Sequence, residues 1–299
     1  MDLNRRAAII LGGLSIAELF TKQSGAEESS DTRQNFGFGW IRDLPDPQDS
    51  LLQAPSFGEP TKRPKLIDLS PKFPKPYDQM RLGSCTANAI AAAVQYARRV
   101  HDKPVDFTPS RLFIYYEARK IIGNIYVDSG SRIRDGIKSV ASIGVPPEDV
   151  WPYDGIPGDP TTHVFPTGAR STLEPPKAVL DAAQKYKAIS YAPLKQDLVT
   201  LESCLASGYP FIFGFSVFSN FHHDTKLLKT PTSDDKATNS GHAVLAVGYN
   251  QEKRTFRIRN SWGASSNKNG YFDMDYDYVL SSGFSSDFWV LYQTLGFID

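Results

Sequence analysis

The chain has few of the features that would let cross-links, net charge or a lipid bilayer determine its fold. Its two cysteines, Cys85 and Cys204, can form at most one disulfide, which excludes a disulfide-dense scaffold. Lysine plus arginine and aspartate plus glutamate both total 33, so no excess of positive charge indicates a nucleic-acid-binding protein. The mostly apolar run Ala7–Ala17 is too short to cross a bilayer, and we predict no stable membrane span.

What the chain does contain is enough apolar material for a large core. Its 299 residues are 40% hydrophobic and 22% charged, which excludes disorder as the overall state. Arg5 and Arg6 precede the apolar run, an order typical of a signal peptide and of a secretory, endolysosomal or extracellular protein. No convincing cleavage site follows it, so a short helix of a pro-segment is the alternative. Residues 24–64 are rich in Gly, Pro, Ser and Asp, which favours an extended surface arm.

The arm and the folded part therefore divide the chain into residues 1–64 and 65–299. The first part of the folded region carries helical patterns, and the second carries short runs rich in Val, Phe, Tyr and Ile. We predict helices over residues 87–96, 110–121, 133–143, 175–186 and 195–206. We predict strands over residues 211–217, 243–249, 255–259, 271–274 and 288–292. A run of helices followed by a run of strands predicts an α+β fold with two lobes.

Cys85 is the residue most suited to chemistry. It follows Gly83-Ser84 and opens an alanine-rich helical stretch, where the free amides of a helix's first turn favour a negative charge. Such a position can lower a cysteine pKa from about 8.5 to roughly 3.5–7.5, which predicts a reactive thiolate. Cys204 is expected to be a buried thiol without a chemical role.

Four segments in a fixed order carry a resemblance to a known family. They are Gln79, six residues before Cys85; Cys85 itself; His242 within Ser-Gly-His-Ala-Val; and Asn260 within Arg-Asn-Ser-Trp-Gly. Together they resemble a papain-like cysteine peptidase, and the resemblance spans roughly Leu66–Phe297. The resemblance implies a helical lobe over about 78–206, a barrel-like β lobe over about 207–299, and an active-site cleft between them.

The resemblance also implies a role for each matching residue. Cys85 would be the nucleophile, His242 its proton-exchange partner, and Asn260 the group that orients the imidazole. Trp262 would shield the histidine–asparagine hydrogen bond, and Gln79 would donate to the oxyanion of the tetrahedral intermediate. The substrates would be polypeptides.

Substrate contacts are implied by weaker matches. Thr86 stands where many members carry tryptophan, which changes the wall beside the nucleophile. Gly130 is our candidate for pairing with an extended substrate backbone, and Ser131 replaces a second glycine. Ala243 would line the pocket for the side chain two residues before the cleaved bond, whose base we expect near residues 285–289. The chain shows no paired-histidine occluding loop, which favours an endopeptidase.

The arm resembles the short pro-segments of the family, so its own N-terminal segment would be a partner of the cleft. It would lie there in a non-cleavable direction and keep the enzyme latent until acid exposure or trans-cleavage removed it. The alternative is a permanent surface element. We expect a monomer.

No cofactor and no metal site are predicted. The adjacent His222-His223 pair would point to opposite faces of a strand, and no cysteine pair accompanies it. Two other functions remain open from the sequence: a catalytically silent binding or inhibitory protein on the same frame, and an amidohydrolase or acyltransferase that uses the same residues.

Overall fold

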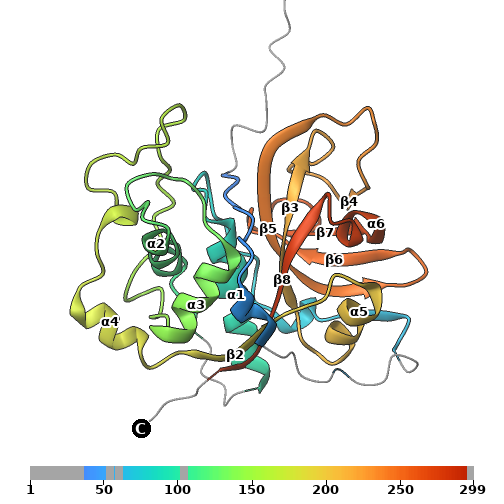
Figure 1. The fold of residues 1–299 in the computed structure, drawn as a ribbon, viewed down its shortest axis with the longest axis horizontal. Helices are drawn as coiled ribbons and strands as arrows, with labels where there is room; N and C mark the ends of the chain where they lie inside the picture. Colours follow the sequence, from blue (N-terminus) through green and yellow to red (C-terminus); the bar gives the residue numbers. More distant parts are fainter. Residues whose placement is uncertain (1–36, 52–56, 58–62, 102–106, 295–299) are drawn as a thin grey trace, which may run out of the picture. The chain divides into compact units, whose positions relative to one another are not determined.

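The computed structural model describes residues 37–51, 57, 63–101 and 107–294, all within the compact unit Thr32–Asp299. Four helices lie on one side of this unit and a large sheet lies on the other (Figure 1). This arrangement confirms the predicted α+β class with a helical and a β-rich part. The signal-like residues 1–20 lie outside the described residues.

The helical side is built around one alanine-rich helix. It comprises α1 (Cys85–His101), α2 (Arg111–Ile121), α3 (Ile133–Ser142) and α4 (Lys177–Ala183), with short 3-10 turns η2 (Pro47–Leu51), η4 (Ser70–Lys72) and η5 (Arg170–Thr172). Every residue from Leu82 to Arg98 is buried, because α1 contacts α2 and α3 on one side and β5 and β8 on the other. Small alanine side chains allow these neighbours to approach α1 closely, so the central helix can be surrounded by protein.

The sheet has eight strands. They are β1 (Leu66–Asp68), β2 (Ala188–Pro193), β3 (Phe211–Phe218), β4 (Leu227–Leu228), β5 (Ala237–Asn250), β6 (Thr255–Arg259), β7 (Tyr271–Asp275) and β8 (Ser285–Thr294). Seven of them follow the order β2-β8-β3-β5-β6-β7-β4, and β1 pairs with β5. The path is open at β2 and β4, so the sheet is curved around its core without closing into a barrel.

Strand register determines which side chains meet at the centre of the sheet. β3 and β5 are antiparallel, and Gly214 lies opposite Ala243 while Phe215 lies opposite His242. β8 pairs with the other edge of β3 and contains a bulge: Ile212 pairs with Trp289, whereas Gly214 pairs with Ser286. Two β8 residues therefore lie opposite one β3 residue, and one of the two, Asp287, has a left-handed backbone with φ +60°.

All five predicted helices and all five predicted strands are present, with ends shifted by a few residues. The last predicted helix, α5 (Leu198–Ala206), contacts β3 and β5 instead of the helical side, and α6 (Tyr276–Leu280) was not predicted. The lobe limit at residue 206 therefore stays a prediction, as does the arm limit at residue 64. None of the helices in the described ranges combines the length and apolarity that a membrane crossing requires.

Candidate active site

The N-terminus of α1 and the middle of β5 bring Cys85 and His242 into one site. Cys85 is the first residue of α1, and its Sγ accepts a hydrogen bond from the backbone N–H of Ala243 at 3.4 Å. Ala243 follows His242 directly in β5. The helix–sheet contact thus positions the sulfur at the strand that carries the imidazole, as the sequence motifs required.

A chain of hydrogen bonds determines the tautomer of His242. Its Nε2 lies 2.8 Å from Oδ1 of Asn260, while Nδ2 of Asn260 donates to Oδ1 of Asn267 at 2.8 Å. Because the Asn260 amide nitrogen is already used as a donor, Asn260 Oδ1 faces the ring, and Nε2 of a neutral imidazole carries the proton. Nδ1 is then the basic nitrogen, and it makes no hydrogen bond within the described residues.

Aromatic rings enclose the His242 imidazole. Trp262 lies 5.2 Å away between ring centroids, and Phe215 and Phe221 approach at 5.7 and 5.9 Å. Phe38, from the N-terminal arm, completes the enclosure with an edge-on contact at 5.6 Å. Burial among these rings lowers the pKa of His242 to about 4, against a smaller opposing effect from the Asn260 hydrogen bond.

Gln79 reaches the site because residues 77–79 pair with the segment that follows β6. The backbone N–H of Gln79 donates to the carbonyl of Ser261 at 2.8 Å, and the Ser261 hydroxyl donates to Gln79 Oε1 at 2.5 Å. This second bond orients the amide, so Nε2 points the other way. Nε2 donates to the carbonyls of Leu82, at 3.0 Å, and Gly37, at 2.5 Å.

Residues 37–41 of the arm occupy the groove over these groups. Trp40 N–H donates to Gly241 O at 3.0 Å, Ser131 N–H donates to Gly39 O at 2.8 Å, and Ile41 N–H donates to Ser131 O at 3.1 Å. The two bonds of Ser131 form a parallel bridge between Trp40 and Ser131. In Figure 1 this segment runs in blue between the helices and the sheet.

Close approach of the arm requires glycine on both sides of the contact. A Cβ added to Gly39 would lie 1.7 Å from Gly83 O, and one added to Gly130 would lie 2.1 Å from Gly39 O. Gly130, our candidate for backbone pairing, therefore provides space, while the backbone of its neighbour Ser131 forms the hydrogen bonds. Both roles toward a substrate stay predictions.

The covered site favours neutral groups, contrary to the thiolate that the helix N-terminus led us to predict. Burial raises the pKa of Cys85 to about 11, and the backbone N–H groups of Ala243 and Gly39 lower it by less. With a raised thiol pKa and a lowered imidazole pKa, proton transfer from sulfur to nitrogen is unfavourable while the arm covers the pair. The sequence argument missed this because it considered the helix N-terminus and not the desolvation of the buried sulfur.

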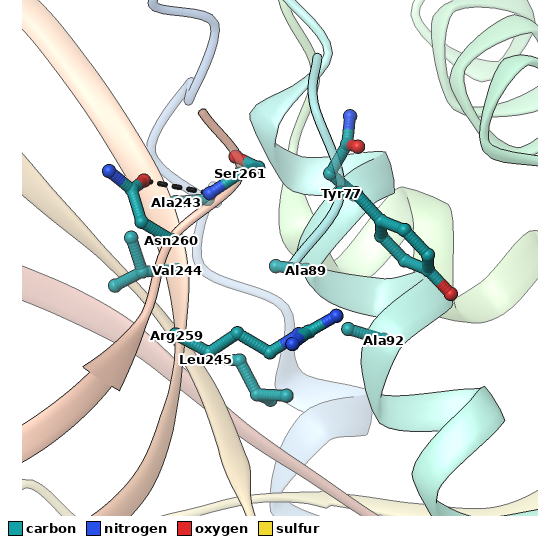
Figure 2. Close-up of a pocket in the computed structure, with 10 residues that line it drawn as sticks. Tyr77, Ala89, Ala92, Ala243, Val244, Leu245, Arg259, Asn260 and Ser261 are labelled. Atoms are coloured by element: carbon teal, nitrogen blue, oxygen red, sulfur yellow. Dashed lines mark hydrogen bonds between the residues drawn. The ribbon is translucent and has the colours of Figure 1, made fainter. Parts of the chain in front are cut away.

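A small cavity lies beneath the site, between α1 and the strands β5 and β6. Figure 2 shows Arg259 reaching from β6 toward Ala92 of α1, with Leu245 beside it. The cavity measures about 10 Å³, roughly the minimum that one water molecule needs. The Arg259 guanidinium donates to the carbonyls of Pro74 and Lys75, both at 2.8 Å. These bonds hold the segment before Gln79 against the sheet.

Both cysteines are buried and unpaired by any disulfide. Over the ranges that the structure describes, no group of three or more His, Cys, Asp or Glu side chains is arranged as a metal site.

The comparisons with known proteins agree with this geometry. A family model described as papain family cysteine protease matches residues 72–288. An uncharacterized peptidase C1-like protein of Acanthamoeba polyphaga mimivirus is 34% identical over 284 residues, which cover 85% of this chain and 86% of that one. The solved structure of xylellain, a cysteine protease from Xylella fastidiosa, is 45% identical, covers 86% of this chain and 96% of its own, and has a TM-score of 0.80. Procathepsin B S9 from Trypanosoma congolense shares the fold at 16% identity and a TM-score of 0.62, with 80% of each chain covered.

Proposed function

This chain belongs to the papain family of cysteine proteases, and we propose that Cys85, His242 and Asn260 perform its peptide hydrolysis, with Gln79 in the oxyanion hole. One observation carries the proposal. The Gln79 side-chain N–H group already holds a peptide carbonyl, that of Gly37, in the groove that also contains the Cys85 sulfur and the His242 ring. A substrate carbonyl in that position would receive the same hydrogen bond.

The proposed reaction follows from the tautomer of His242. In the uncovered site, Nδ1 accepts the thiol proton, and the Cys85 sulfur attacks the carbonyl carbon while Gln79 Nε2 and the Cys85 backbone N–H donate to the developing oxyanion. The leaving amine takes the proton from Nδ1, which leaves a thioester on Cys85. Nδ1 then takes a proton from water, whose oxygen attacks the thioester carbonyl. The C–S bond breaks, the carboxylic acid product is released, and the Cys85 sulfur takes the proton back from Nδ1.

Asn260 supports both protonation states of the ring. Its Oδ1 accepts from Nε2–H whether or not Nδ1 is protonated. Its Nδ2 donates to Asn267 Oδ1 and its Oδ1 also accepts from the Ser261 backbone N–H, which keeps the amide in that orientation. We therefore assign Asn260 a positioning role: it holds the ring through Nε2 and leaves Nδ1, which makes no hydrogen bond within the described residues, for proton exchange with Cys85.

We further propose that the chain is made as a latent precursor of an endopeptidase, with residues 37–51 as the inhibitory element. Gln79 holds the carbonyl of Gly37, whereas the group on the sulfur is the backbone N–H of Gly39. Among the described arm residues, different peptide groups thus face Gln79 and Cys85, which supports docking in a form that is not cleaved. Ion pairs from Arg134 to Asp49, at 2.7 Å, and from Lys138 to Asp46, at 2.9 Å, hold the end of the arm.

Labelling with an irreversible epoxide tests the nucleophile. We expect the reduced full-length chain to label slowly when intact and rapidly after the arm is cleaved in trans. Cys85→Ala should abolish labelling and peptide hydrolysis, whereas the matched variant Cys204→Ala should label like the parent.

Two outcomes would contradict the proposal. Labelling that persists in Cys85→Ala would reject this nucleophile, and a cleaved, reduced chain that labels but cuts no peptide in a diverse library would favour an amidohydrolase, acyltransferase or binding protein. Cleavage within library peptides, away from their ends, would support an endopeptidase.

A further inference from the structure

The Trp40 side chain fills a slot whose floor has no side chains. Its indole lies against Gly214 of β3 and Gly241 of β5, where an added Cβ would come within 2.0 and 2.4 Å of the ring. Both glycines therefore leave bare backbone, against which a flat group can lie. Because Trp40 also makes the backbone bridge with Ser131, its side chain enters the slot in a fixed register.

A carboxylate closes the end of this slot. Asp287 Oδ2 accepts hydrogen bonds from the indole Nε1 of Trp40 at 2.9 Å and from the backbone N–H of Asp43 at 2.8 Å. Asp287 Oδ1 accepts from the hydroxyl of its neighbour Ser286 at 3.0 Å. Two of these three donors belong to the arm and leave with it.

The backbone at Asp287 is arranged to hold that carboxylate there. Asp287 lies in the β8 bulge opposite β3 and has a φ of +60°, a conformation that non-glycine residues adopt at an energetic cost. Bulges re-aim side chains and are frequent beside functional sites. The acidic end of the slot is thus a property of the sheet and remains when the arm departs.

Resting on the proposed function, we propose that this slot selects a basic side chain, arginine before lysine, at the substrate position that replaces Trp40. A half-buried carboxylate that has lost two donors is best satisfied by a cationic donor. Arginine combines a planar guanidinium, which can lie on the bare backbone of Gly214 and Gly241, with several N–H groups for Asp287. Leucine and phenylalanine would fill the slot but leave the carboxylate without these bonds.

The test uses the full-length chain after its arm is cleaved in trans, which removes Trp40 and empties the slot. Peptides that differ only in Arg, Lys, Leu or Phe two residues before the cleaved bond are compared by kcat/KM. We expect Arg to exceed Leu by about tenfold or more, the size of effect that a charge-assisted bond produces. Adding Asp287→Asn, which tolerates the left-handed backbone, should remove most of that preference by lowering the rate for the Arg peptide.

A carboxylate outside the groove provides the matched control. Asp273 in β7 pairs with Arg257 at 3.3 Å, and Asp273→Asn should leave the Arg-to-Leu ratio unchanged. Equal rates for Arg and Leu, or a preference for Arg that survives Asp287→Asn, would overturn the inference while leaving the peptidase proposal intact.

Calorimetric binding of the same peptides to the Cys85→Ala chain after the same cleavage of its arm separates the two proposals. If no peptide is cut by any variant but Arg peptides bind about tenfold more tightly than Leu peptides through Asp287, the proposed function fails and the slot assignment stands. If no variant cuts and binding does not depend on Arg, both are rejected.

Discussion

Single side chains orient the two amide groups of the site, those of Gln79 and Asn260. Ser261 fixes the Gln79 amide by donating to its oxygen, and Asn267 fixes the Asn260 amide by accepting from its nitrogen. Each of these partners determines which end of an amide faces the chemistry. A reaction that depends on a donor at one point and an acceptor at another requires this control.

Loss of the Gln79 donor should therefore reduce turnover more than substrate binding. We expect Gln79→Ala in the arm-cleaved enzyme to lower kcat by about 10²–10³, with little change in KM. Ser261→Ala should lower kcat in the same direction by a smaller factor, because the donor remains but its orientation is no longer fixed. Steady-state kinetics of both variants checks this.

Gln184 provides the comparison, since it is exposed at the end of α4. Gln184→Ala should match the parent in kcat and KM. A Gln79→Ala enzyme with unchanged kcat would remove Gln79 from the oxyanion hole.

In residues 37–40 of the arm, glycines alternate with aromatic residues. Gly37 and Gly39 let the backbone approach Leu82 and Gly83, while Phe38 and Trp40 turn toward His242 and the Asp287 slot. The alternation follows from the two-residue period of extended backbone, which directs neighbouring side chains to opposite faces.

Adding a methyl group at Gly39 should release the arm without damage to the folded unit. Its Cβ would overlap Gly83 O, and such overpacking costs about 1–3 kcal/mol, so we expect Gly39→Ala to raise the epoxide labelling rate of the intact chain by about tenfold or more. The melting temperature of the arm-cleaved product should be that of the parent.

Gly283 is the matched position, because the nearest atom to an added Cβ there is Ser281 Oγ at 3.7 Å. Gly283→Ala should label at the parental rate. Equal labelling of Gly39→Ala and the parent would show that the close contact at Gly39 does not limit access to Cys85.

At the scale of the whole molecule, the arm and the sheet are joined by two tryptophan–carboxylate hydrogen bonds, and each side supplies one tryptophan and one carboxylate. Trp40 of the arm donates to Asp287 of β8, and Trp289 of β8 donates to Asp43 of the arm at 2.9 Å. Asp43 also accepts from the Arg134 backbone N–H at 3.3 Å. Burial and the nearby Asp287 raise the pKa of Asp43 to about 7, and burial raises the pKa of Asp287.

These two carboxyl groups should consequently make docking of the arm weaken as pH rises. His242 acts in the opposite direction between about pH 4 and 6.5, because its pKa is lowered in the covered site. A carboxyl group whose pKa is higher in the docked state binds a proton on docking, so its contribution is complete below pH about 4 and is lost as pH passes through about 7. Arg134 and Arg42 oppose this effect by favouring the ionised carboxylates. The lowered pKa of Asp46, paired with Lys138, acts in the opposite direction but below pH 4.

Limited proteolysis of the arm in the intact chain measures this dependence directly. We expect faster cleavage near pH 7.5 than near pH 5, and a flatter profile in Asp43→Asn, whose side chain keeps its shape but does not titrate. The opposite slope, with release at pH 5, would reject the carboxyl pair as the controlling group. The predicted slope favours trans-cleavage over acid exposure as the activating event.

The sequence predicted what local patterns encode. Helix and strand periodicity located the elements, and the motifs around Cys85 and His242 identified residues that the fold does bring into one site. Two properties depended on contacts distant in sequence. Burial by elements distant in sequence raises the pKa of Cys85 and lowers that of His242. The bulge that contains Asp287 depends on strand register, which composition does not reveal.

The two indole–carboxylate hydrogen bonds between the arm and the sheet have a consequence for tryptophan fluorescence. The chain has four tryptophans, and Trp40 and Trp289 each donate to a carboxylate across the boundary that opens when the arm departs. Departure would bring both indoles into contact with solvent, so emission intensity and wavelength should change in step with activation. The intact enzyme would thereby carry its own fluorescent reporter of maturation, readable in real time without any added dye.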